Sequence, residues 1–265
     1  RLLVDWPGLF SWLLKAANLL RRLGVAALSR PVWRLVGLPG LAEADEQVQE
    51  APLEFLCEIL RRRPVPAAPT WLYFAACGPN YLYPRVGEAT VSALEFLRGS
   101  GRFLDNGCCG LLAYNYGDIE DARVLARRNI ERFEAAGVGG PVVGDCSSCV
   151  AFLKSYPQLF LGDPAWKARA ESFAARVQDS PEILGEAAAE LPSLELPAAT
   201  YHDSCRAGHA QGLKPHARAV MEKIAGSAFR ELPESDVCCG GAGAFAFRNP
   251  ELSDDILRRK IGRIA

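Results

Sequence analysis

Nine cysteines in a chain of 265 residues constrain this protein more than any other feature of its sequence. Eight of them fall into two sets, and each set contains an adjacent pair followed by glycine. The first set has five members and the second has three: Cys77, Cys108, Cys109, Cys146 and Cys149, then Cys205, Cys238 and Cys239. Disulfide scaffolds are usually short secreted chains. The length of this chain therefore favours metal or redox chemistry, with inert core thiols as the alternative.

The spacing within the first set indicates the kind of metal site. A Cys-x-x-Cys segment such as Cys146–Cys149 turns back, so that both sulfurs can bind one metal or cluster. A disulfide between Cys108 and Cys109 would close a strained ring, so we expect two thiolates that reach different metal atoms. Five sulfurs also exceed the four ligands that one zinc ion takes. A cluster of several irons is the better match.

Glycines accompany both adjacent pairs. Gly107 and Gly110 flank the first pair, and Gly240 follows the second. Without side chains, they let the backbone approach a bulky cofactor and let its amides donate to sulfide. Taken alone, they are explained equally well by tight turns.

Strands alternate with helices in the part of the chain that carries the cysteines. The pattern predicts strands at residues 71–76 and 141–144, and helices at residues 86–98 and 119–136. This alternation is typical of an α/β fold with a Rossmann-like parallel sheet. In such sheets functional loops follow the carboxyl ends of the strands, and the cysteines occupy those positions.

The second cysteine set repeats the first at a nearly constant distance. Cys205 follows Cys77 by 128 positions, and Cys238 follows Cys108 by 130. We therefore expect a duplicated domain: a helical N-terminal region at residues 1–68, a first domain at 69–195 and a second at 196–265. The second domain is expected to be incomplete, because its Cys-x-x-Cys would fall about ten positions beyond Ala265.

Two further residues have alternative interpretations. Cys57 lies in a predicted helix at residues 52–63 and is expected to be a small core residue. His202 precedes Cys205 by three positions. We expect a hydrogen-bonded histidine at a strand end, with a cluster ligand as the alternative.

Charge and hydropathy exclude some classes of function. Thirty Lys and Arg against 31 Asp and Glu argue against nucleic-acid binding. No apolar run reaches the length of a membrane span, and no signal peptide is recognised, so a cytoplasmic location is expected. Residues 1–42 are basic. They are expected to form helices that pack on the body, or a docking surface for a partner subunit or for peripheral contact with an anionic membrane.

The pattern Cys77…Cys108-Cys109-Gly110…Cys146-Ser-Ser-Cys149 resembles the cysteine-rich CCG domain. This domain occurs duplicated in the cysteine-rich subunit of heterodisulfide reductase and in iron–sulfur subunits of glycolate and lactate oxidases. The segments Cys77–Pro84, Tyr116–Asp118 and Ala126–Ile130 resemble the glycolate oxidase subunit more than the reductase. The resemblance covers residues 70–265.

The resemblance implies an electron-transfer subunit of a 2-hydroxyacid oxidoreductase. Each complete motif would hold a [4Fe–4S] cluster, so one cluster is expected and a second, at Cys205, Cys238 and Cys239, is conceivable. Electrons would come from a flavin subunit on another chain and pass to a quinone or another carrier. Two departures stand out: Arg206 replaces a common histidine, and no ferredoxin-like cysteine segment precedes Trp6.

Two alternatives remain. In a protein similar to the cysteine-rich subunit of heterodisulfide reductase, the cluster itself would cleave a disulfide in a pocket. A zinc-stabilised binding module would have no redox role.

Overall fold

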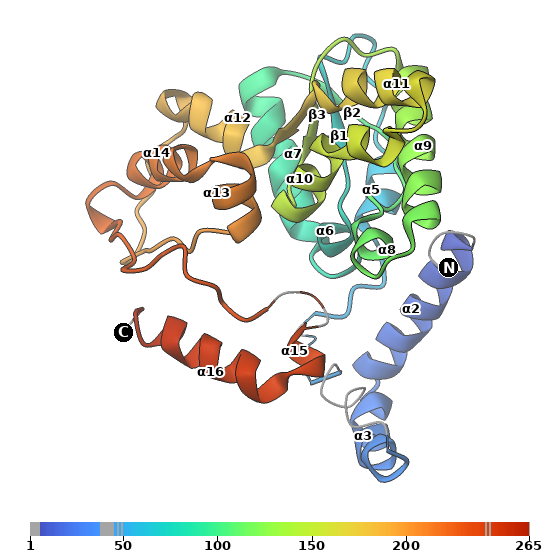
Figure 1. Ribbon diagram of the computed structural model, residues 1–265. Coiled ribbons are helices and arrows are strands. Elements are labelled where there is room, and N and C mark those ends of the chain that lie inside the picture. The colour runs from blue at the N-terminus through green and yellow to red at the C-terminus, as the bar shows by residue number, and fades with distance from the viewer. Residues whose placement is uncertain are drawn as a thin grey trace. The chain divides into compact units, whose positions relative to one another are not determined.

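The computed structural model describes residues 6–37, 45–46, 48, 50–241, 243 and 245–264. It divides the chain into two compact units, Arg1–Asp179 and Ser180–Ala265 (Figure 1). The expectation that no signal peptide begins the chain concerns residues 1–5, which lie outside the described part. No described helix is long and apolar enough to cross a bilayer.

The first unit is built on a parallel sheet of four strands. These are β1 (Trp71–Phe74), β2 (Gly101–Phe103), β3 (Val142–Gly144) and β4 (Val177–Asp179), in the order β2-β1-β3-β4. In the register of the sheet, Leu72 lies between Arg102 and Val142. Helix α7 (Pro84–Arg98) joins β1 to β2, and α9 (Ile119–Ala136) joins β2 to β3. The predicted α/β fold with a parallel sheet is confirmed.

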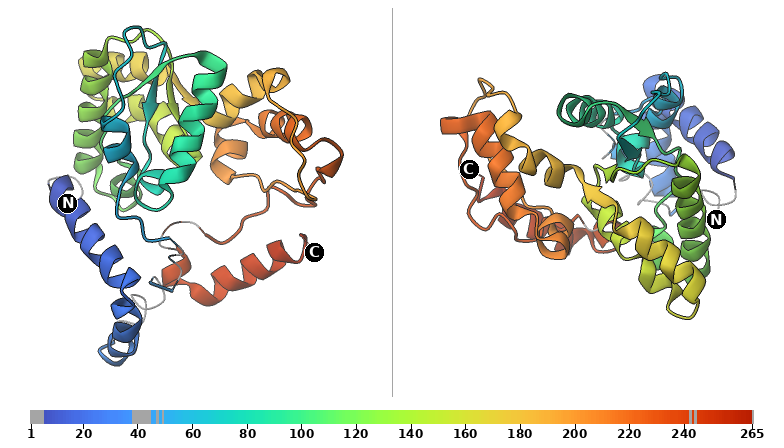
Figure 2. Two further views of the ribbon diagram at one scale, coloured as in Figure 1. Left: turned by 180° about the vertical axis from the view of Figure 1, so that it is seen from behind. Right: turned by 90° about the horizontal axis from the view of Figure 1, so that it is seen from above.

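Helices cover both faces of this sheet (Figure 2). Leu72 and Phe74 belong to the main core, with side chains from α9, α10 (Ser147–Lys154), η1 (Tyr156–Phe160) and α11 (Pro164–Ala174). Trp71 and Tyr73 point to the other face, because alternate residues of a strand do so. There α7 packs closely with α5 (Leu56–Arg61). A Cβ on Gly87 of α7 would lie 2.1 Å from a methyl carbon of Leu56 and 3.0 Å from the Tyr73 hydroxyl.

Two helices precede the sheet, α2 (Pro7–Arg22) and α3 (Val25–Leu35). One side of α2 packs on the first unit: Lys15 Nζ lies 2.6 Å from the Glu58 carboxylate, and the Phe10 ring meets the Tyr81 ring edge-on at 5.3 Å. Asn18 donates to the Pro52 carbonyl oxygen at 2.8 Å. Most of the other large apolar side chains on or beside α2 are exposed: Trp6, Leu9, Trp12, Leu13, Leu19, Leu20 and Leu23.

The second unit is helical in its described residues. It contains α12 (Ser180–Glu186), η2 (Ala188–Glu190), α13 (Cys205–Gln211), α14 (Lys214–Ala225), η3 (Gly226–Ala228), α15 (Phe245–Arg248) and α16 (Pro250–Ile261). In the described part of this unit, the β-type backbone pairing is one isolated parallel bridge, between Ala199 and Phe229. A three-layer arrangement like that of the first unit is therefore not formed by the described residues here.

Candidate metal centre

Five cysteines of the first unit form one connected group beyond the carboxyl ends of β1, β2 and β3. Cys77 begins α6 (Cys77–Tyr81), Cys108 and Cys109 lie in the loop after β2, and Cys146 directly precedes α10. The sulfur of Cys109 lies 3.3 Å from that of Cys149. Cys149 also hydrogen-bonds to Cys77 and Cys146, and Cys108 hydrogen-bonds to Cys109. The structure thus brings together all five cysteines of the first set, and all are free thiols.

Hydrogen bonds between the thiols divide this group into donors and acceptors. A hydrogen bond with Cys149 lowers the pKa of Cys146 to about 7, against the opposing effect of burial. Hydrogen bonds with Cys108 and Cys149 hold the pKa of Cys109 well below its usual value. The same contacts raise the pKa of Cys108 and of Cys149. A hydrogen bond with Cys149 also lowers the pKa of Cys77. Since the thiolate is the form that ligates metals, the lowered pKa values of Cys77, Cys109 and Cys146 favour ligation.

Two buried polar side chains hold the backbone of the adjacent pair. Asn129 of α9 donates to the Cys108 carbonyl oxygen at 2.9 Å and accepts from the Gly107 amide at 3.0 Å. The Tyr156 hydroxyl donates to the Cys109 carbonyl oxygen at 2.7 Å. Both side chains are fully buried. We did not single them out from the sequence, although an asparagine on the apolar face of α9, beside Ala126, was a usable signal.

Asn106 joins the loop that carries Cys77 to the loop that carries Cys108. Its side chain accepts from the Ala75 amide at 2.8 Å and donates to the Ala75 carbonyl oxygen at 2.9 Å. These two bonds replace a missing step of the β1–β2 ladder, two residues before Cys77. The loops that carry Cys77 and Cys108 are therefore fixed to each other by one buried side chain.

The glycine after each adjacent pair has the same local geometry. Gly110 has φ +90°, and its amide donates to the Cys108 sulfur at 3.5 Å. Gly240 has φ +81°, and its amide donates to the Cys238 sulfur at 3.3 Å. A Cβ on Gly110 would meet Ala122 of α9 at 3.4 Å, and one on Gly240 would meet the Ser253 carbonyl oxygen of α16 at 2.6 Å. The duplication seen in the sequence thus extends to the turn and to the helix behind it.

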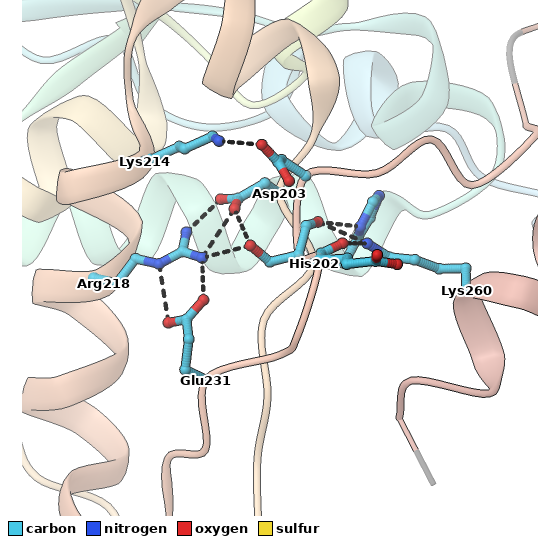
Figure 3. A network of polar contacts seen from close by, with 9 residues as sticks. His202, Asp203, Lys214, Arg218, Glu231 and Lys260 are labelled. Carbon is cyan, nitrogen blue, oxygen red and sulfur yellow. Dashed lines mark hydrogen bonds and ion pairs between the residues drawn. The ribbon is translucent and has the colours of Figure 1, made fainter.

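A polar network holds the loops of the second set (Figure 3). Arg218 forms an ion pair with Asp203 and another with Glu231. The Ser235 hydroxyl donates to Asp203 at 2.8 Å. Lys260 of α16 is buried and donates to the carbonyl oxygens of Glu234 and Ser235 at 2.7 Å each. Asp203 precedes Cys205 by two positions and Ser235 precedes Cys238 by three, so the network fixes both cysteine loops.

His202 belongs to the same network. Its Nδ1 lies 3.0 Å from the Ser235 carbonyl oxygen. The expected hydrogen bond is therefore present, but His202 lies in a loop and not at the end of a named strand.

The second set is less closely assembled than the first. Cys205 and Cys238 are exposed and Cys239 is half-buried, and among the described residues no hydrogen bond joins the Cys205 sulfur to the other two. Within the described ranges, no three His, Cys, Asp or Glu side chains surround a position for a single metal ion. The five thiols of the first set are therefore a hydrogen-bonded group and not a preformed one-ion site.

A cavity of about 290 Å³ borders the first set. Its lining includes Cys77 and Cys108 together with Cys57, Asn80 and Arg132. The core position expected for Cys57 is wrong, since this residue is half-buried and faces the cavity. The physical reason is the pitch of α5: its neighbours Leu56 and Leu60 take the core side, and Cys57 lies about 100° around the helix from Leu56.

The first set fits an iron–sulfur cluster in its donor chemistry. Such clusters are bound by cysteine thiolates, and the five residues that would hold one are Cys77, Cys108, Cys109, Cys146 and Cys149. Their loops are braced by buried amide and hydroxyl groups, as is usual around metal ligands. The Gly110 amide lies close to the Cys108 sulfur, whereas the Gly107 amide donates to Asn129 and not to a sulfur.

Comparison with known proteins places these features in a family. The cysteine-rich domain family CCG matches residues 71–154 and 199–265. Lactate utilization protein A of Exiguobacterium sp. is 33% identical over 203 residues, which cover 74% of this chain and 81% of that protein. The protein of the same name from Geobacillus kaustophilus is 32% identical, with 72% and 80% covered. The probable glycolate oxidase iron-sulfur subunit of Bacillus subtilis is 30% identical, with 72% and 44% covered. The chain therefore belongs to the cysteine-rich CCG domain family.

Proposed function

We propose that this chain is the iron–sulfur subunit of an oxidoreductase complex that oxidises a small 2-hydroxyacid of the lactate or glycolate type. The observation that carries this proposal is the connected group of five thiols on three loops of one parallel sheet. The names of its relatives, which refer to lactate utilization and to a glycolate oxidase iron-sulfur subunit, support the choice of substrate class.

In this proposal the five cysteines of the first set hold one [4Fe–4S] cluster, which supplies one-electron transfer when bound. The chain's own residues hold and shield it. Asn129 and Tyr156 fix the adjacent pair, and Cys109 and Cys149, each 5% exposed, keep water from one side. Cys205, Cys238 and Cys239, with Gly240 beside them, are proposed as ligands of a second cluster.

The partners of the chain follow from the same proposal. A flavoprotein subunit would oxidise the hydroxyacid, and a quinone or another carrier would take the electrons. The exposed apolar side of α2 is a candidate docking face. We also propose that residues 69–195 and 196–265 act as the two cysteine-rich domains, with residues 1–68 as the helical region before them.

A second candidate function is favoured by one observation. The cavity of about 290 Å³ reaches two of the proposed ligands, Cys77 and Cys108. A cluster edge open to a cavity can bind and reduce a small molecule, as in the alternative that resembles heterodisulfide reductase. A buried cluster without such access would favour electron transfer alone.

Metal analysis of the full chain, purified without oxygen, tests the proposal. We expect about four irons and four sulfides per cluster, brown colour and no stoichiometric zinc. Cys109→Ser should lose iron and visible absorption, whereas the matched variant Cys57→Ser should keep both. Colourless protein with one zinc per chain would contradict both redox functions. An unchanged iron content in Cys109→Ser would contradict the ligand assignment.

A further inference from the structure

The cavity beside Cys77 and Cys108 contains a cation without a counter-ion. Four side chains that are charged at neutral pH line it: Glu58, Arg61, Arg128 and Arg132. Glu58 is neutralised by Lys15 at 2.6 Å, and Arg61 by Asp105 at 2.7 Å. Arg132, in contrast, is exposed and forms no hydrogen bond or ion pair with any residue that the structure describes.

The position of this guanidinium is set by α9. Arg132 follows Asn129 by three residues, so both project from the same side of the helix. Its Nη1 lies 3.5 Å from the place that a Cβ on Gly107 would occupy. The guanidinium thus lies beside the backbone that leads into Cys108. Arg132 is also close enough to Cys57 to favour its thiolate electrostatically, although burial still raises the pKa of that thiol to about 11.

A buried amide offers a second uncommitted donor in the same cavity. Asn80 is 7% exposed, and its Oδ1 accepts from the Cys57 amide at 2.9 Å. That bond assigns the oxygen and leaves the Nδ2 group as a donor, which has no partner among the described residues. Asn80 lines the cavity, and its Nδ2 group is not among the buried polar atoms that lack a partner. This donor is therefore accessible from the cavity and can bind a ligand acceptor.

The two donors and the size of the cavity define a ligand class. Arginine binds carboxylate through two parallel hydrogen bonds, and a volume of about 290 Å³ admits only a small molecule. The neighbouring cysteine ligands would carry negative charge, which disfavours a dianion such as phosphate and favours a single carboxylate. Asn80 adds one donor for a neutral oxygen.

We propose that this cavity binds a small monocarboxylate with an oxygen on C2, a 2-hydroxy or 2-oxo acid, whose carboxylate pairs with Arg132 and whose C2 oxygen accepts from Asn80. The inference deepens the proposed function and rests on it for the identity of the acid. It places the acid on this chain, next to Cys77 and Cys108, in addition to any site on a flavoprotein.

Calorimetric titration of the iron-loaded full chain, without oxygen, tests the proposal with three probes. L-lactate has both groups, propionate lacks the C2 oxygen, and L-lactamide lacks the charge. We expect lactate to bind about tenfold or more tightly than either analogue, since one hydrogen bond to a charged or buried group is worth about that factor. Arg132→Gln should weaken lactate binding by about ten- to a hundredfold and abolish the preference over lactamide.

Two further variants complete the test. Asn80→Asp keeps the acceptor for the Cys57 amide but repels a carboxylate, and should abolish lactate binding while iron content and circular dichroism stay unchanged. Arg85→Gln removes an exposed arginine that does not line this cavity and should change nothing. Equal binding of lactate and lactamide, or undiminished binding in Arg132→Gln, overturns the inference. Absence of iron would contradict the proposed function instead, and is measured separately.

Discussion

Asn129 and Tyr156 meet in the interior of the first unit, where the Asn129 side-chain amide lies 3.1 Å from the Tyr156 hydroxyl. Each also holds one carbonyl oxygen of the adjacent cysteine pair, at Cys108 and Cys109 respectively. Asn129 and Tyr156 thus connect α9 and η1 to the loop that carries Cys108 and Cys109. Neither residue can ligate iron in this position, so their effect on the site is exerted through the backbone.

Tyr156→Phe tests this bracing. The change removes the donor to the buried Cys109 carbonyl oxygen without altering the packed ring, and we expect the free energy of unfolding to fall by about 1–3 kcal/mol. Urea denaturation monitored by circular dichroism measures it. Tyr116→Phe is the matched control, because Tyr116 is 60% exposed. Equal stability of the two variants would contradict the bracing role.

The glycine turns permit a paired comparison in each unit. Gly110→Ala and Gly117→Ala both place a Cβ on a residue with positive φ, which costs about 1–2 kcal/mol. Only Gly110 also faces a helix, with Ala122 at 3.4 Å, whereas nothing lies near Gly117. We therefore expect Gly110→Ala to be the more destabilising of the two.

The same comparison in the second unit should give a larger difference. At Gly240 a Cβ would lie 2.6 Å from a backbone oxygen, while Gly212 faces open space at a similar φ. Thermal unfolding of all four variants checks the order. If Gly240→Ala melted at the same temperature as Gly212→Ala, the close packing of this turn against α16 would be refuted.

Local sequence signals predicted the first unit well for physical reasons. The helix at 119–136 was predicted with its observed bounds, because Asp118 caps its start and Gly137, with φ +63°, ends it. The strand run at residues 71–76 was predicted from continuous burial, and β1 ends at Phe74 because Asn106 takes over the backbone of Ala75. The expected strand topology placed the cysteine loops at one edge of the sheet.

Other features depend on contacts between residues far apart in the sequence. The network of Asp203, Arg218 and Ser235 joins positions up to 32 apart, and no periodicity indicates which ion pairs form. The backbone amide of Cys57 donates to Asn80, which lies 23 positions later. The apolar pattern of α2 correctly predicted a helix. The pattern alone did not reveal that Lys15, Phe10 and Asn18, and not the exposed leucines, contact the rest of the first unit.

Asp203 should make the second unit sensitive to acid. Burial opposes its ionisation, but hydrogen bonds from Arg218 and Ser235 outweigh burial and lower the pKa of Asp203 below its ordinary value. Because the pKa is lower in the folded chain, the stabilisation is fully present above the unfolded value of about 3.9 and is lost as the pH falls through the folded pKa.

Asp203→Asn removes this dependence. At neutral pH we expect it to lower the free energy of unfolding by about 1.5–3 kcal/mol, since hydrogen bonds to a charged group are lost. Below pH 3 the difference from the unchanged chain should shrink. Denaturation between pH 2.5 and pH 7 measures both, and Asp254→Asn, on the exposed side of α16, is the control. A difference that stays constant with pH would contradict the charged pair.

The exposed apolar side of α2 gives the last prediction. Trp12 is 64% exposed, whereas Phe10 on the opposite side packs against Tyr81. We expect Phe10→Ala to lower the free energy of unfolding by about 1–2 kcal/mol, through the lost aromatic contact and apolar burial. Trp12→Ser should change it by less than about 0.5 kcal/mol.

The basic residues near this side are only partly compensated by acidic partners. Arg21 and Arg30 both pair with Asp45, and Arg34 pairs with Glu46. Arg34 has a carboxylate of its own in Glu46 and Trp12 has no such partner among the described residues, so Trp12→Ser should weaken docking and binding of an apolar dye more than Arg34→Gln does. Denaturant titration and dye fluorescence measure the two effects. If Trp12→Ser destabilised the chain as much as Phe10→Ala, the leucine side of α2 would face the body and no docking surface would remain there.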